Sequence, residues 1–255
     1  MKLAYDEAGH GECVVLIHGH PFSRSLWQPQ VAALQEQFRV LAPDLRGFGD
    51  SPVTPGLVTM REYAADIEGL LDELGITRAA VVGLSMGGLV TMELAVSQPE
   101  RYWAVGLVAT TAQPPTPGER VIRMERADAV DRDGMGVLVD YMHSGLYGPA
   151  CPLAVRQRID AMMLAASPAG AAAALRGRAG RPDYQPALAR LDIPAFVCAG
   201  SADPWSDQAV TAEITACLKR PELLVIEGAG HLPNLEAESN FNQALLGFLR
   251  AHAPS

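Results

Sequence analysis

A serine between two glycines is the residue of this sequence best suited to covalent chemistry. Gly83, Ser85 and Gly87 form the pattern Gly-x-Ser-x-Gly, which follows a β-branched run and precedes a helical pattern over 89–97. A serine hydroxyl becomes a useful nucleophile only beside a base, and only when the oxyanion formed by its attack is stabilised. A sharp strand-to-helix turn meets both needs, because it exposes the side chain and points backbone amides at the reacting carbon. The pattern therefore predicts Ser85 as a nucleophile.

His231 is the candidate general base for this serine. It follows the last expected strand, 223–226, in a glycine-flanked loop from which an imidazole can reach Ser85 across the end of the sheet. There it would accept the hydroxyl proton and later return it to the leaving group. The other histidines lie in early turns, in an inserted segment or near the C-terminus: His10, His18, His20, His143 and His252. Because none of these follows a late strand, the sequence favours His231.

Strands and helices alternate along most of the chain, which is typical of a mostly parallel sheet flanked by helices. The expected strands are short apolar runs at 1–7, 13–17, 39–42, 79–82, 102–109, 195–199 and 223–226. The expected helices carry apolar residues at helical spacing and lie at 27–37, 59–74, 89–97, 207–218 and 234–251. The class expected from this order is α/β.

The alternation stops after the strand that ends near Ala109. A proline-rich run at 113–118 is followed by helical patterns and segments rich in alanine, glycine and arginine, without a convincing strand, up to about Pro186. We therefore expect one core made of residues 1–112 and 186–255, with a helical cap of residues 113–185. A chain of 255 residues has the length for one such domain.

Composition excludes several classes of partner. The net charge of −9 argues against nucleic acid and against an anionic membrane surface, because phosphate groups need a basic face. No window approaches the roughly 18 apolar residues of a spanning helix. Residues 1–7 turn acidic before an apolar segment can form, so we expect no secretory signal and a cytoplasmic location. The cysteines fit no metal pattern and read as buried thiols in a reducing compartment: Cys13, Cys151, Cys198 and Cys217.

Five motifs together resemble those of the α/β-hydrolase fold, over nearly the whole chain outside the cap. They are His18-Gly19-His20-Pro21, Asp44-Leu45-Arg46-Gly47-Phe48-Gly49, Gly83-Leu84-Ser85-Met86-Gly87-Gly88, Gly200-Ser201-Ala202-Asp203 and Gly230-His231-Leu232-Pro233-Asn234-Leu235-Glu236. The resemblance implies that Asp203 orients His231 and stabilises its charged form, in the chain order Ser, Asp, His. The nearby Asp207 is more simply the N-cap or first turn of the next helix.

The same resemblance implies an oxyanion hole built from two backbone amides. Met86, the residue after the nucleophile, would supply one amide and His20 the other, with Phe22 as the alternative donor in the same turn. The resemblance also implies that Asp44 and Arg46 form an ion pair that fixes their loop rather than taking part in catalysis.

An apolar pocket is expected between the cap and the loops of the core. Phe22, Tyr141, Met142 and Trp205 are the candidate substrate-binding residues. Further candidates come from the cap: Met135, Leu138, Leu146, Tyr147, Met162, Met163 and Leu164. Such a pocket would suit small or medium substrates with an aliphatic or aromatic acyl part.

The expected activity is hydrolysis of a carboxylic ester or lactone through an acyl-enzyme, without a cofactor or metal, by a monomer or homodimer. The resemblance leaves open a carbon-carbon bond hydrolase, a cofactor-free haloperoxidase or perhydrolase, and an acyl-homoserine lactonase. His18-Gly19 counts mildly against enol-lactonases, and Ser85 excludes relatives that use an aspartate nucleophile. A different class is a binding protein on this fold that captures a ligand without turnover.

Overall fold

A seven-stranded sheet in the order β1-β3-β2-β4-β5-β6-β7 forms the centre of the computed structural model, which describes residues 1–254. The strands are β1 Tyr5–Ala8, β2 Cys13–Ile17, β3 Arg39–Pro43, β4 Ala79–Leu84, β5 Tyr102–Val108, β6 Pro194–Gly200 and β7 Arg220–Ile226. Neighbouring strands run parallel except β1, which pairs antiparallel with β3 at one edge. The α/β class and the mostly parallel sheet are therefore confirmed.

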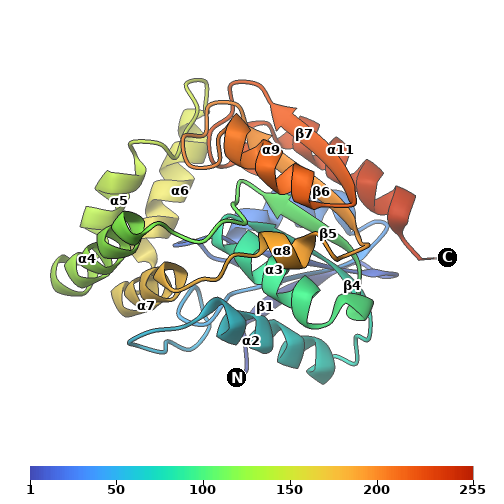
Figure 1. The fold of residues 1–255 in the computed structure, drawn as a ribbon, viewed down its shortest axis with the longest axis horizontal. Coiled ribbons are helices and arrows are strands. Elements are labelled where there is room, and N and C mark those ends of the chain that lie inside the picture. The colour runs from blue at the N-terminus through green and yellow to red at the C-terminus, as the bar shows by residue number, and fades with distance from the viewer. Residues whose placement is uncertain (255) are drawn as a thin grey trace.

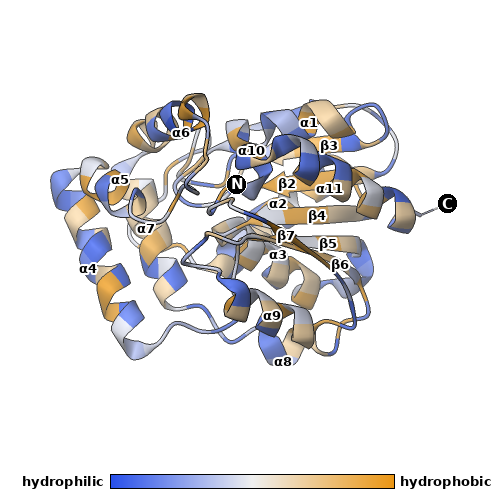
Figure 2. Ribbon diagram, turned by 90° about the horizontal axis from the view of Figure 1, so that it is seen from above, coloured by the Kyte–Doolittle hydropathy of each residue, from blue (hydrophilic) through white to orange (hydrophobic). Residues whose placement is uncertain are grey.

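Helices cover both faces of this sheet (Figure 2). They are α1 Gln28–Leu34, α2 Met60–Glu73, α3 Met86–Ser97, α8 Gln185–Leu188, α9 Gln208–Cys217, α10 Pro233–Glu236 and α11 Glu238–His252. α1 packs with α11 on one face, while α2, α3, α8 and α9 follow one another on the opposite face. Strands β2, β4, β5 and β6 are buried along their whole length, which explains their continuous apolar sequences.

Local signals fix several helix ends. Thr59 and Glu62 form a capping box at the start of α2, and Gly75 follows its end with φ +67°. Asp207 caps α9, as expected, by accepting a hydrogen bond from the Val210 amide. The expected helix 234–251 is instead two helices, because Ala237 leaves helical geometry at φ −135° and ψ 53°.

Four further helices lie between β5 and β6 and gather beyond one end of the sheet (Figure 1). They are α4 Pro117–Asp133, α5 Gly136–Met142, α6 Leu153–Ala165 and α7 Pro168–Ala179, and we refer to them as the inserted helices. α4 packs along α7. The cap boundaries at 113 and 185 stay a prediction. Within residues 1–254, no helix combines the length and the apolar composition needed to cross a membrane.

Candidate active site

Ser85 lies in the sharp turn between β4 and α3 with φ 55° and ψ −111°, a conformation that residues with a β-carbon rarely adopt. Two hydrogen bonds from the neighbouring strand hold this turn. The Ser85 amide donates to the Val108 carbonyl at 2.8 Å, and the Thr110 hydroxyl donates to the Ser85 carbonyl at 2.8 Å. The turn therefore projects the serine side chain beyond the end of the sheet.

The glycines on either side of Ser85 are required by close backbone packing. A Cβ at Gly83 would lie 2.1 Å from the Gly87 carbonyl oxygen, and a Cβ at Gly87 would lie 2.2 Å from the Ile17 carbonyl oxygen. Both separations are far below van der Waals contact. The spacing of the motif thus has a steric origin: the turn closes on itself and on the end of β2.

Asp203 and His231 form a buried pair at the same end of the sheet. Asp203 follows β6 and His231 follows β7, and His231 Nδ1 lies 2.7 Å from Asp203 Oδ2. Asp203 also accepts hydrogen bonds from the Trp205 amide, at 2.8 Å, and from the Ser206 hydroxyl. Burial alone would raise the pKa of Asp203, but the charge and hydrogen bond of His231, with these two donors, hold it below its usual value. The carboxylate is therefore kept charged beside the imidazole.

The loop that carries His231 is held by the chain between α5 and α6. The His231 amide donates to the Leu146 carbonyl at 2.9 Å. The Glu236 carboxylate accepts from the amides of Gly148, at 2.8 Å, and Gly230, at 3.1 Å, and so ties the two loops together. The Trp205 ring meets the imidazole edge-on, with centroids 4.9 Å apart. The inserted segment thus helps to position the imidazole.

Ser85 and His231 line one cavity of about 370 Å³. Because His231 Nδ1 faces Asp203, the other ring nitrogen, Nε2, is the one available to a serine. Within residues 1–254, the Ser85 hydroxyl makes no hydrogen bond to His231, so the two side chains meet only as walls of the cavity. Hydrogen bonds of this kind are often long in a free enzyme and shorten when substrate binds.

The turn after β2 contains both candidates for the second oxyanion donor, His20 and Phe22, and its hydrogen bonds distinguish them. The Phe22 amide donates to the Gly19 carbonyl at 3.0 Å, so Phe22 is already engaged within the turn. Its side chain is buried and is not among the residues that line the cavity, so its contact with substrate stays a prediction. Met86 begins α3, where an amide has no acceptor within the helix, and His20 lines the cavity. The geometry is compatible with the pair His20 and Met86.

The imidazoles of this turn are neutral and structural. Leu45 donates its amide to His18 Nε2 at 3.0 Å, so His18 carries its proton on Nδ1, which donates to the Gly19 carbonyl at 2.8 Å. His20 Nε2 lies 3.0 Å from the Ala171 carbonyl and donates to it. Burial lowers the pKa of both rings, and burial together with the charge of Arg178 brings the pKa of His20 to about 3.

This neutral His20 predicts a loss of stability in mild acid. Its folded pKa lies below its ordinary value of 6.5, so the unfolded chain binds the proton first, and stability falls as the pH drops from 6.5 toward 3. Each such histidine contributes at most about 1.4 kcal/mol per pH unit to that slope. In His20→Gln, which keeps a donor for the Ala171 carbonyl, urea titrations between pH 6.5 and 5 should show a shallower slope. An unchanged slope would mean that His20 is protonated in the folded protein.

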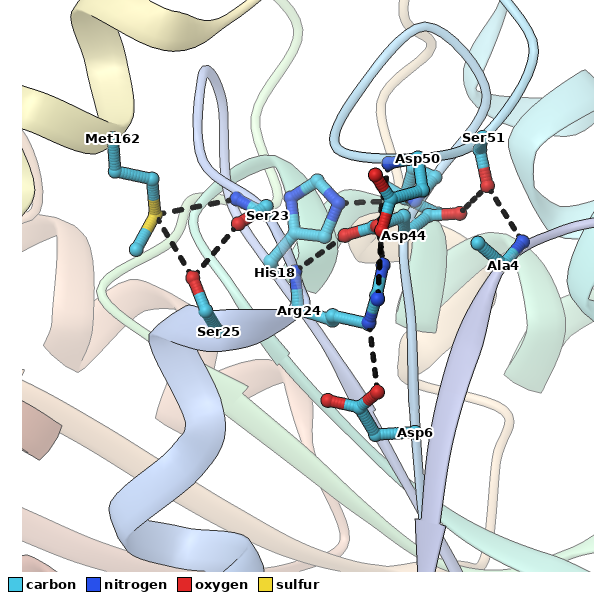
Figure 3. A network of polar contacts seen from close by, with 11 residues as sticks. Ala4, Asp6, His18, Ser23, Arg24, Ser25, Asp44, Asp50, Ser51 and Met162 are labelled. Atoms are coloured by element: carbon cyan, nitrogen blue, oxygen red, sulfur yellow. Dashed lines mark hydrogen bonds and ion pairs between the residues drawn. The ribbon is translucent and has the colours of Figure 1, made fainter.

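The loop after β3 is fixed by ion pairs, but not by the expected one. Asp44 pairs with Arg24, while Arg46 pairs with Asp66 of α2 through two hydrogen bonds. Figure 3 shows Asp44 at the centre of a network in which Arg24 also reaches Asp6 and Asp50. The expected Asp44–Arg46 pair is therefore wrong in its partners, although both side chains hold the loop in place.

The cavity is only in part the apolar pocket expected from the sequence. Tyr141, Met142 and Trp205 line it, together with Leu138. The other expected cap residues are not among its lining: Met135, Leu146, Tyr147, Met162, Met163 and Leu164. Four arginines line it instead: Arg123, Arg126, Arg178 and Arg181. Met135, Leu146 and Met163 are buried in the core, whereas Leu164 is 57% exposed to solvent.

One pattern in the sequence indicates that some of these arginines lie close together. Arg120, Arg123 and Arg126 recur at intervals of three in a helical segment, which places them near one face of α4. The partners on α7 and just after it, Arg178 and Arg181, lie some fifty residues further on. Only the packing of α7 along α4 reveals that they share a cavity.

Comparison with known proteins identifies relatives along the whole chain. A model of the family described as the alpha/beta hydrolase family matches residues 14–244. 3-Oxoadipate enol-lactonase 1 of Acinetobacter baylyi is 32% identical over 231 residues, which cover 89% of this chain and 84% of that protein.

Solved structures show the same similarity in three dimensions. A thermophilic esterase from Thermogutta terrifontis, described as malate bound, has a TM-score of 0.94 and 36% identity, covering 98% of this chain and 94% of that one. The enol-lactonase from Burkholderia xenovorans has a TM-score of 0.87 and 28% identity, covering 97% of this chain and 96% of that one. Both comparisons include the inserted helices as well as the sheet.

Proposed function

Because the chain belongs to the alpha/beta hydrolase family, we propose that it is a serine hydrolase that cleaves small to medium carboxylic esters or lactones. Ser85 is the nucleophile and His231 is the general acid and base. Asp203 orients the imidazole and stabilises its charged form. The amides of Met86 and His20 bind the oxyanion. These residues need no cofactor for the reaction.

The reaction follows in two stages. The Ser85 Oγ attacks the carbonyl carbon while its proton passes to His231 Nε2, and the two amides hold the negative oxygen of the tetrahedral intermediate. The intermediate collapses as His231 protonates the leaving alkoxide, which leaves an acyl-enzyme. Water then attacks the acyl carbon, gives its proton to His231 and releases the acid, and the proton returns to Ser85. In a lactone, the leaving hydroxyl stays attached to the acid product.

The observation that carries this proposal is the buried Asp203–His231 pair on the cavity that Ser85 also lines. A buried carboxylate beside an imidazole costs free energy that a purely structural loop would avoid. The named activities of the relatives, enol-lactone and ester hydrolysis, support the same reaction class.

A serine-directed probe tests the proposal. A fluorophosphonate should label the protein, mass spectrometry should locate the label on Ser85, and Ser85→Ala should not be labelled. The wild-type protein should turn over p-nitrophenyl butyrate, with an initial burst of p-nitrophenol if hydrolysis of the acyl-enzyme is slower than its formation. Labelling without turnover would indicate a ligand-binding protein, and cleavage of a ring-cleavage diketone without ester turnover would indicate a carbon-carbon hydrolase. A label on another residue would refute the assignment of Ser85.

A further inference from the structure

The cavity beside Ser85 holds a concentration of positive charge in a protein whose net charge is −9. Arg123 and Arg126 come from α4, Arg178 from α7, and Arg181 from the chain just after α7. One carboxylate, Glu119, lines the same cavity among residues 1–254. Its charge is shared, because Glu119 also accepts hydrogen bonds from the Thr116 amide and hydroxyl in the capping box of α4.

Arg178 is the arginine with the least compensation. In the described chain, its guanidinium has no hydrogen-bond or ion-pair partner, and its Nε is shielded from solvent. Arg176, two residues earlier on the same helix, pairs with Asp128 and Asp131 of α4, each at 2.7 Å. Residues two apart on a helix point to opposite sides, so Arg178 lines the cavity and Arg176 does not.

The other three arginines are also left with free donors. Arg123 has a buried Nη1 without a partner in the described residues, and its Nη2 lies 3.6 Å from Glu119. Arg126 lies over the Tyr141 ring at 3.3 Å. Arg181, which is buried, donates to the carbonyls of Gln113 and Arg178 at 3.1 and 3.2 Å. One carboxylate, a ring and two carbonyls do not neutralise the charges of these three arginines.

The pKa values of Arg178 and Arg181 reflect this shortage of anions. Burial lowers the pKa of Arg178 to about 9, with a further contribution from the charges of Arg123 and Arg181. Burial and the charge of Arg123 likewise lower the pKa of Arg181 to about 10. Both groups remain charged at neutral pH, at a cost in free energy that a bound anion would offset. The charge of Arg178 also lowers the pKa of His20, which lines the same cavity, so this charge lies close to the turn after β2.

We propose that the natural ester or lactone carries a carboxylate on its acyl chain, and that Arg178, assisted by Arg123 and Arg126, binds this carboxylate while Ser85 attacks the carbonyl. The planar guanidinium suits a carboxylate because it can donate two parallel hydrogen bonds to it. A cavity of about 370 Å³ has room for a short diacid monoester. This inference rests on the proposed function and narrows its substrate class.

Two matched esters test the proposal: mono-p-nitrophenyl glutarate, which ends in a carboxylate, and its methyl ester, which is neutral. The wild-type protein should prefer the acid in kcat/KM by about 10-fold or more, since a charged hydrogen bond contributes roughly 10- to 100-fold in affinity. Arg178→Gln should remove most of that preference, whereas Arg178→Lys should keep part of it. Arg176→Gln, the control on the same helix, should leave the preference within about 3-fold of wild type.

Binding without turnover separates this inference from the proposed function. Calorimetry should detect glutarate binding to Ser85→Ala, and a second substitution, Arg178→Gln, should weaken it by about 10- to 100-fold. If neutral and acidic esters are hydrolysed equally well and glutarate does not bind, the carboxylate proposal fails while the hydrolase proposal stands. If glutarate binds but no ester is hydrolysed, the carboxylate proposal stands while the hydrolase proposal fails.

Competition by inorganic phosphate without competition by glutarate would replace the carboxylate with a phosphorylated acyl chain. Should Arg178→Gln not fold, Arg123→Gln tests the same preference.

Discussion

Asp203→Asn is expected to lower kcat for ester hydrolysis by about four orders of magnitude while leaving the protein folded. The asparagine amide has nearly the same shape as the carboxylate, but it cannot stabilise the imidazolium that forms when His231 takes the Ser85 proton. An amide can also present an N–H group to His231 Nδ1, which would favour the wrong tautomer. Because Asp203 lies 2.7 Å from that nitrogen and is buried, water cannot replace the lost charge.

Asp207→Asn is the matched control, because this residue lies four positions along the same segment and is exposed. Its side chain only caps α9, and asparagine caps helices about as well as aspartate. Steady-state kinetics on p-nitrophenyl butyrate should therefore show kcat within about 3-fold of wild type for this control. Circular dichroism would establish that both variants are folded. If Asp203→Asn retained more than a tenth of the wild-type kcat, another carboxylate would have to orient His231.

The sheet could be predicted from the sequence because its signals are local. β2 spans Cys13–Ile17 as expected, since five consecutive apolar residues followed by a histidine and a glycine leave little choice of element. The turn at Ser85 was equally accessible. Its neighbours Gly83 and Gly87 sit where a Cβ would collide with the backbone, so the requirement for glycine is written into the motif itself.

Pairings between distant charged residues could not be predicted in the same way. Asp44 has Arg46 two positions away, yet it pairs with Arg24, because the turn after β2 brings Arg24 beside it while α2 offers Asp66 to Arg46. Two residues that are close in the sequence need not have side chains that are close in space at the edge of a sheet. The arginines of the cavity pose the same problem, because Arg126 and Arg178 share it only through the packing of α4 along α7.

The inserted helices have two roles that the sequence did not separate. They line the cavity with arginine, and the chain between α5 and α6 also holds the His231 loop through Leu146 and Gly148. Without this segment the amide of His231 and the carboxylate of Glu236 would each lose a partner, so the loop that carries the imidazole would be held by fewer hydrogen bonds.

A second large effect is expected in stability rather than in rate, at Asp44. Its carboxylate is fully buried and accepts hydrogen bonds from the Arg24 guanidinium and from the amides of Arg24, at 2.6 Å, and Asp50, at 2.9 Å (Figure 3). Asp44→Ala would leave two amides without their acceptor and would remove the one buried carboxylate among the three that pair with the Arg24 guanidinium. Breaking a buried pair in this way costs about 3–5 kcal/mol of the free energy of unfolding.

Asp50 provides the exposed comparison, because it pairs with the same Arg24 at 2.8 Å but is 75% exposed. Solvent screens this pair and replaces its hydrogen bonds, so Asp50→Ala should cost less than about 1 kcal/mol. Urea unfolding of the two variants at pH 7 should therefore separate them by at least 2 kcal/mol, as expected when one carboxylate is buried and also accepts two amide hydrogen bonds while the other is exposed. Equal losses would show that the loop is held by the net charge around Arg24. The loop that contains Asp44 also contacts the turn after β2, because the Leu45 amide donates to His18. Loosening this loop in Asp44→Ala would therefore also loosen the turn that carries His20. The stability of the loop is in this way linked to the proposed oxyanion hole.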